Sequence, residues 1–132
     1  MADKISFDLV SPERLLLSED AEMVTLPGTE GDLGVLPGHE PLITTLRPGV
    51  IAVKGGGQGD ARFFVMGGFA EVNPEKLTVL AEEALPMADM DAAALNQRIS
   101  NTKEDLLVAK SERERARLVQ MLDSLEQARA AL

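Results

Sequence analysis

The stretch EGDLGVLPGHEPL, residues 30–42, gathers most of the residue types that could do chemistry in this chain. It holds three glycines, two prolines and the chain's only histidine, His39. A phosphate-binding loop needs backbone N–H groups that lead into a helix N-terminus, usually with a lysine nearby. This stretch has no lysine, carries Glu30, Asp32 and Glu40, and leads into the strand-like run LITTL. The pattern therefore argues against a phosphate loop.

His39 is the remaining candidate for a general base. A catalytic base needs a nucleophile or an orienting partner, and the chain has no cysteine and no serine in a nucleophile-elbow setting. A single histidine also cannot build a histidine metal cluster. We interpret His39 as a surface or interface residue, and we expect a non-catalytic protein with no cofactor and no metal site. The alternative of a small enzyme would require a nucleophile–base pair that the sequence does not offer.

Composition excludes several classes of partner. The chain has 132 residues, with 13 basic and 22 acidic side chains and a net charge of −9. This charge repels phosphate backbones, so nucleic-acid binding is not expected. No apolar run approaches the roughly 20 residues that a membrane-spanning helix needs, so we expect no direct membrane insertion. The N-terminal residues show no pattern of a targeting leader.

The chain divides into two halves of different composition. All 11 glycines and all 7 prolines precede residue 88, which predicts one domain over 1–87 and a second over 88–132. The first half consists of short runs with alternating polarity, separated by turn residues, and this pattern predicts an antiparallel β-sandwich. The expected strands are KISFDLV, RLLL, AEMVTL, LITTL, VIAVK, RFFVMG, FAEV and LTVLAE.

The second half changes to a helical period. Apolar residues recur at spacings of three and four, from Ala92 to Leu106 and from Leu118 to Leu132, which predicts two amphipathic helices of about 20 residues each. Asp89 or Asp91 is expected to cap the first helix, and SERE at 111–114 has the form of a capping box. We expect a hairpin that turns near residues 110–111. One continuous helix is the alternative, because the turn contains no glycine or proline.

The whole chain resembles the epsilon subunit of F-type ATP synthases, which is called delta in mitochondria. The resemblance is carried by SEDAEMVTLPGTEGDLGVLPGHEPLITTLRPGVIAV at 18–53 and GGFAEVNPEKLTVLAEEA at 67–84. It implies a non-catalytic subunit with an N-terminal β-sandwich and a C-terminal helical hairpin. It also implies that the sandwich binds the gamma shaft and the c-ring and turns with them. Such a protein would be peripheral, on the cytoplasmic face of the bacterial inner membrane.

The same resemblance implies roles for individual residues of the first motif. The loop over 30–42 would contact the c-ring and the foot of gamma. The contact residues carried over are Glu30, Asp32, His39, Glu40 and Pro41, and the residues expected to set the loop's geometry are Gly31, Gly34, Pro37 and Gly38. A purely local role of the glycines in turns is compatible with this contact.

The hairpin has an implied regulatory role. In the family it can extend along gamma and block ATP hydrolysis, and Arg113, Arg115 and Arg117 are the cations that could meet the alpha and beta subunits of the catalytic head. The competing interpretation, which we favour, pairs these arginines with Glu112 and Glu114 at i,i+3 within the helix.

ATP binding is the other role that some family members give to this region. Those members bind ATP through an Asp followed three residues later by Arg. Here Asp91 is followed by Ala93 and Ala94, without the arginine, so we do not expect an ATP site. The alternative function, a free-standing ATP-sensing protein, would need that arginine.

Overall fold

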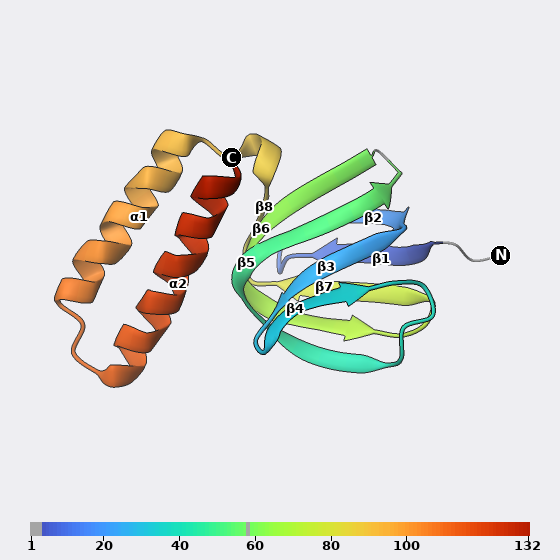
Figure 1. The fold of residues 1–132 in the computed structure, drawn as a ribbon, viewed down its shortest axis with the longest axis horizontal. Coiled ribbons are helices and arrows are strands. Elements are labelled where there is room, and N and C mark those ends of the chain that lie inside the picture. The colour runs from blue at the N-terminus through green and yellow to red at the C-terminus, as the bar shows by residue number, and fades with distance from the viewer. Residues whose placement is uncertain (1–3, 58) are drawn as a thin grey trace.

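The protein is a β-sandwich with a hairpin of two α-helices packed on one side (Figure 1). The computed structural model describes residues 4–57 and 59–132. Within these residues the sandwich comes first and the helices follow, as the sequence predicts. The elements are β1 Ile5–Val10, β2 Leu15–Ala21, β3 Met23–Gly28, β4 Gly31–Val35, β5 Leu42–Gly56, β6 Gly59–Val72, β7 Lys76–Ala81, β8 Ala84–Pro86, the 3-10 helix η1 Met87–Asp89, α1 Ala92–Leu107 and α2 Glu112–Ala131.

The strands form one hydrogen-bonded sheet that folds over on itself. Their order is β2-β1-β7-β6-β5-β3-β4, and β8 pairs with β6 beside this path. Every pairing is antiparallel except that of β1 with β7, which is parallel. The expected antiparallel sandwich is confirmed, with this one parallel pair as a difference. The pair needs no crossover helix, because the intervening strands β2–β6 make the connection.

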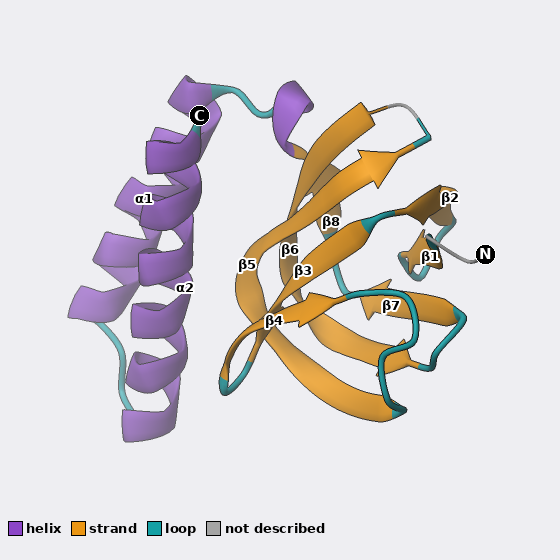
Figure 2. Ribbon diagram, turned by 45° about the vertical axis from the view of Figure 1, so that its right-hand side comes forward, coloured by secondary structure: helices purple, strands orange, loops and turns teal. Residues whose placement is uncertain are grey.

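Strands β5 and β6 are long, at 15 and 14 residues. The runs LITTL and VIAVK join into β5, and RFFVMG and FAEV join into β6, although the sequence suggested four separate strands. Pro48 pairs with Met66 inside the ladder, and Gly67 and Gly68 have φ values of 100° and 129°. These turn-type residues bend the strands without ending them. As a result the first half of β6 pairs with β8 and its second half with β7 (Figure 2).

The sandwich core follows the alternation of the strands. Ile5, Phe7 and Leu9 of β1 are fully buried, as their period-2 spacing predicts. Because the chain has few aromatic residues, aliphatic side chains fill most of this core. Its other buried members are Ala21, Val24, Leu26, Val35, Leu46, Ile51, Val53, Phe63, Val65, Ala70, Val72, Leu77, Val79 and Ala81.

On its outer face, β1 is tied to both neighbouring strands through Asp8. The Ser18 hydroxyl of β2 donates to the Asp8 carboxylate at 2.7 Å, and the Lys76 ammonium at the start of β7 lies 3.0 Å from it. The hydrogen bond from Ser18, and then that from Lys76, lowers the pKa of Asp8 below its ordinary value. The ionised carboxylate therefore helps to hold three strands together.

The two C-terminal helices form the predicted hairpin, not one continuous helix. Asp91 caps α1 by accepting from the Ala93 amide at 2.9 Å, and the Ser111 hydroxyl oxygen accepts from the Glu114 amide at 3.0 Å at the start of α2. Helix α2 lies between α1 and the bent strand β5 (Figure 1). Among the described residues, no helix is long and apolar enough to cross a membrane.

Candidate functional site

The stretch 30–42 is not a single loop. Thr29 and Glu30 form the turn of a β-hairpin, β4 follows, and a second turn at Pro37 and Gly38 leads towards β5. A strand of five residues spans about 17 Å, so the two turns lie at opposite ends of β4 (Figure 2). Glu30 is therefore separated from His39, Glu40 and Pro41, and the motif supplies two surfaces where we expected one.

The four residues expected to set the loop's geometry lie in different settings. Gly31 and Gly38 have φ values of 133° and 87°, which suits glycine, and Pro37 lies beside Gly38 in the second turn. Gly34 instead lies inside β4, opposite Thr25. There its missing side chain matters through packing, because a Cβ would approach the Met23 methyl group to 2.7 Å.

Asp32 already has a partner within this chain. One nitrogen of Arg47, Nη2, donates to the Asp32 carboxylate at 2.7 Å, and the other, Nη1, donates to the Gly28 carbonyl oxygen at 2.6 Å. The guanidinium thus joins β5 to the β3–β4 hairpin. Sequence reasoning missed Arg47, because the pairing depends on the register of strands far apart in sequence. The Asp32 side chain remains 67% exposed, so a second cation can still approach its carboxylate.

His39 lies in the second turn, where backbone hydrogen bonds fix the chain. The His39 amide donates to the Leu36 carbonyl at 3.1 Å, and the Gly38 amide donates to the Pro74 carbonyl at 2.8 Å. The imidazole Nδ1 is 2.7 Å from the Glu40 carbonyl oxygen, to which it can only donate. This hydrogen bond orients the ring through its own loop.

Exposed apolar side chains surround this turn. Leu36 is 53% exposed and Ile43 is 69% exposed, and Glu40 and Pro41 are also exposed. We call the group Leu36, Pro41, Leu42 and Ile43 the end surface. It lies on the side of the sandwich away from the helical hairpin (Figure 2). A rigid turn that presents apolar residues loses little entropy when it docks on a partner.

A second apolar surface lies over β1, β6 and β7. Phe69 and Leu80, which are 44% and 40% exposed and pair across β6 and β7, line a shallow hollow of about 240 Å³ together with Val10 and Pro12. We call these four residues the side surface. Sequence reasoning did not single it out. A signal was present in LTVLAE, where Leu80 occupies an outward position of a strand whose inward positions are also apolar.

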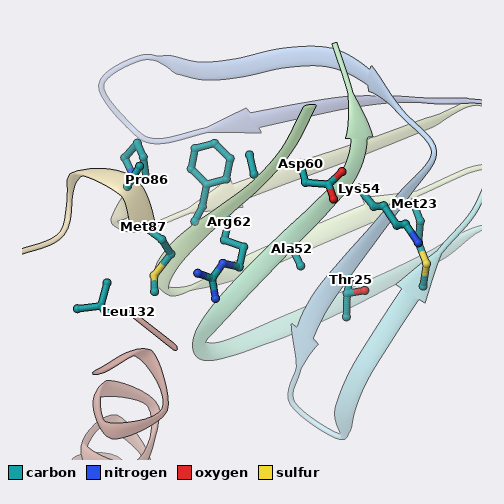
Figure 3. A pocket seen from close by; sticks show the side chains of 12 residues that line it. Met23, Thr25, Ala52, Lys54, Asp60, Arg62, Pro86, Met87 and Leu132 are labelled. Atoms are coloured by element: carbon teal, nitrogen blue, oxygen red, sulfur yellow. The ribbon is translucent and has the colours of Figure 1, made fainter. Parts of the chain in front are cut away.

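The largest hollow described, of about 760 Å³, opens over the outer face of β3, β5 and β6 (Figure 3). Lys54, Asp60 and Arg62 provide its charges, and Met87 and Leu132 close one side. The Asp60 carboxylate accepts from the Gly55 amide at 2.8 Å and so holds the β5–β6 turn. Asp91, the acid of the ATP motif, is not among the lining residues, because it caps α1.

The three arginines of the hairpin lie at the start of α2, beside the α1–α2 turn. Arg113, Arg115 and Arg117 are all exposed. In the described part of the chain they form no ion pair with Glu112 or Glu114. The expected intrahelical pairing is therefore wrong in this structure, and the three guanidinium groups are available to a partner.

The fold and these surfaces define a class of protein: a β-sandwich with exposed apolar surfaces, joined to a helical hairpin. The family described as "ATP synthase, Delta/Epsilon chain, beta-sandwich domain" matches residues 4–87. The chain is 50% identical over 129 residues to the ATP synthase epsilon chain of Parvibaculum lavamentivorans, covering 98% of each. It is 49% identical over 120 residues to that of Rhodospirillum rubrum, covering 91% of this chain and 90% of the other. The chain belongs to the ATP synthase epsilon chain family.

Solved structures agree with this assignment. A chain of the Euglena gracilis mitochondrial ATP synthase, from a structure described as containing OSCP, F1 and the c-ring, matches with a TM-score of 0.82 at 26% identity, over 99% of this chain and 82% of that one. A chain from the central stalk and c-ring of the Tetrahymena thermophila enzyme matches with a TM-score of 0.68 at 12% identity, over 96% of both. At this low identity, the second match shows a shared fold and nothing more.

Proposed function

We propose that this chain is the non-catalytic epsilon subunit of a proton-translocating F-type ATP synthase and works in its central stalk. It binds the gamma shaft and the c-ring through the sandwich and turns with them, so that rotation of the ring reaches the catalytic subunits. The observation that carries the proposal is the pair of exposed apolar surfaces on a sandwich of this family. Apolar residues clustered in the open on a small acidic protein are typical of docking sites.

The two surfaces suit two different partners. The side surface offers an aromatic anchor, Phe69, on rigid strands, which suits a long-lived contact with the gamma shaft. The end surface combines apolar residues with Glu40 and His39 on a tight turn, which suits the polar loops of the c-ring. Glu30 and Asp32, at the other end of β4, would face a different part of the same partners. In this arrangement the subunit is peripheral, on the cytoplasmic face of the bacterial inner membrane.

The hairpin is the proposed inhibitory element. Its free arginines at the α1–α2 turn supply positive charge for the alpha and beta subunits if the helices leave the sandwich. Two helices of 16 and 20 residues laid end to end would reach about 54 Å. Because the arginines lie at the start of α2, the 16 residues of α1, about 24 Å long, would separate them from the sandwich, and the rest of α2 would reach farther still.

Binding to gamma tests the side surface. We expect Phe69→Glu combined with Leu80→Glu to weaken binding to the isolated gamma subunit by about 30-fold or more, because buried anchors contribute about 2 kcal/mol or more. Val119→Glu is the matched control, since Val119 is 53% exposed but lies on α2. Ile43→Glu should leave gamma binding intact and reduce proton pumping in reconstituted complexes. Unchanged gamma affinity in the double variant, with its melting temperature preserved, would remove the side surface from the proposal.

A further inference from the structure

The seam between the sandwich and the hairpin is rich in methionine. Four of the chain's six methionines lie in the cluster that joins the two parts. Met66 comes from β6, Met87 from η1, Met90 from the link to α1, and Met121 from α2. Their neighbours in this cluster are Phe64, Leu95, Leu125 and Ala128, together with the partly buried Val50 and Ile99. The much larger core of the sandwich contains no methionine among its described members.

The seam methionines differ in how open they are to solvent. Met87 is only 4% exposed, whereas Met66, Met90 and Met121 are half-buried at the edge of the cluster. A small oxidant in water therefore reaches the latter three first. Methionine is a flexible, polarisable residue that fills irregular apolar contacts, and its thioether is readily oxidised.

Two polar contacts between described residues also join the hairpin to the sandwich. The Ser124 hydroxyl of α2 donates to the Pro48 carbonyl oxygen of β5, and Arg98 of α1 meets Glu83 at 3.1 Å. The Arg98–Glu83 pair is exposed and contributes little in water. The apolar cluster is therefore the larger part of the described attachment, and a polar atom introduced into it would weaken the docked state.

We propose that Met66, Met90 and Met121 form an oxidation site, and that their conversion to sulfoxides releases the hairpin from the sandwich. With hydrogen peroxide as oxidant, a sulfur lone pair attacks one peroxide oxygen, an S–O bond forms, the O–O bond breaks and water leaves. The sulfur loses two electrons and the peroxide gains them. Enzymatic reduction of the sulfoxide reverses the change.

The sulfoxide oxygen weakens the docked state because it needs a hydrogen-bond donor. The nearby donor of α2, Ser124, is already committed to Pro48, and the rest of the cluster is apolar. Each sulfoxide that the closed seam leaves without a donor shifts the equilibrium towards the released hairpin by about tenfold. Release is a property of the chain by itself. Any effect on ATP hydrolysis rests in addition on the inhibitory role proposed above.

Amide hydrogen exchange on the isolated full-length chain tests the site. After mild peroxide treatment, with sulfoxides located by mass spectrometry, we expect peptides of α2 to exchange about tenfold faster or more. Peptides of β1 in the sandwich core should be unchanged. The triple variant Met66→Leu, Met90→Leu, Met121→Leu keeps similar side-chain volume. Its α2 peptides should exchange at the same rate before and after peroxide treatment. The control Met23→Leu removes a half-buried methionine outside the seam and should respond like the natural chain.

Three outcomes would overturn the inference. They are the absence of sulfoxide at all three seam methionines while Met23 is oxidised, oxidation of the seam without faster exchange in α2, and an equal response of the triple variant. None of these outcomes bears on binding to gamma, so the proposed function is tested separately by the gamma-binding experiment.

Discussion

At the residue scale, a role that depends on neighbours in the sequence can be predicted from the residue type. A role that depends on a partner from another strand cannot. Asp91 was expected to cap a helix and does so, because capping depends on neighbours within three residues. Asp32 was expected to contact a partner subunit, and the structure adds an ion pair with Arg47, fifteen residues away. Sequence gives no signal for such a pair until the register of β3, β4 and β5 is known. The free arginines of α2 make the same point, because the i,i+3 spacing permits an ion pair without enforcing it.

Asp8 makes the stability of the sandwich depend on pH. Because its pKa is lowered in the folded state, its contribution is full above the ordinary value near 3.8 and is lost as the pH falls through the folded value. We expect Asp8→Asn to lower the free energy of unfolding by roughly 1 kcal/mol at pH 7. The difference from the natural chain should shrink in strong acid. Urea unfolding at a series of pH values measures it, and a difference that grows towards low pH would contradict the assignment.

Gly68 tests whether the bend of β6 requires glycine. Its φ is 129°, and a Cβ there would overlap the Leu80 carbonyl oxygen. Gly31 has a similar φ of 133°, but nothing lies within 4 Å of its missing Cβ. We expect Gly68→Ala to destabilise the chain by about 3 kcal/mol or more and Gly31→Ala by about 1–2 kcal/mol. Thermal unfolding measures both losses of stability. If the two variants lose the same stability, backbone strain alone accounts for the cost at both positions, and the close approach of the Leu80 carbonyl adds nothing.

At the scale of elements, the sequence predicted which segments are strands better than where they end. The period-2 pattern of β1 and the two capping signals are local, and the structure agrees with them. Strand β4 was interpreted as loop, because GDLGV is short and rich in glycine. Pro48 and Gly67 were interpreted as breaks, although long-range pairing carries β5 and β6 through them. Turn residues mark a change of direction, and only tertiary pairing decides whether a strand ends there.

The division into elements predicts that residues 1–87 fold alone. The described core of the sandwich lies within these residues. Among the described residues, removal of the helices uncovers the 1–87 side of the seam, which consists of Val50, Phe64, Met66 and Met87. About 87 residues exceed the size at which small domains need disulfides or metals. We expect a cooperative thermal transition of the 1–87 fragment, at a lower temperature than that of the whole chain. Circular dichroism and calorimetry measure it, and a fragment without a cooperative transition would show that the hairpin is part of the folding unit.

At the scale of the whole molecule, the end surface and the free arginines lie in different parts of the chain. The β4–β5 segment that carries the end surface lies on the side of the sandwich away from the hairpin (Figure 2), so under the proposed function the c-ring contact does not depend on whether the hairpin is docked. The acidic residues are concentrated in the sandwich, and the free arginines lie at the tip of the hairpin. Under the proposed function, such a subunit keeps its c-ring contact while the hairpin changes position.

Removal of residues 88–132 tests this separation. We expect assembly and ATP synthesis to be largely unchanged, because the proposed gamma and c-ring contacts all lie in the sandwich. ATP hydrolysis should rise, but by no more than about tenfold. The closed hairpin is held by Leu125, Ala128 and the seam methionines and should be well populated at rest, which leaves little of the inhibitory form to remove.

The size of that rise measures the resting equilibrium of the hairpin. A tenfold change corresponds to a shift of about 1.4 kcal/mol in the free-energy difference between the docked and the extended hairpin. The free arginines of α2 act in the opposite direction, because unpaired cations strengthen attraction to an acidic head. Hydrolysis assays on full-length and truncated complexes at matched ATP separate the two effects, with the triple substitution Arg113→Gln, Arg115→Gln, Arg117→Gln as the control that keeps the seam intact. If truncation raises hydrolysis far beyond tenfold and the arginine variant does the same, attraction to the head outweighs the seam, and the hairpin rests in its released form.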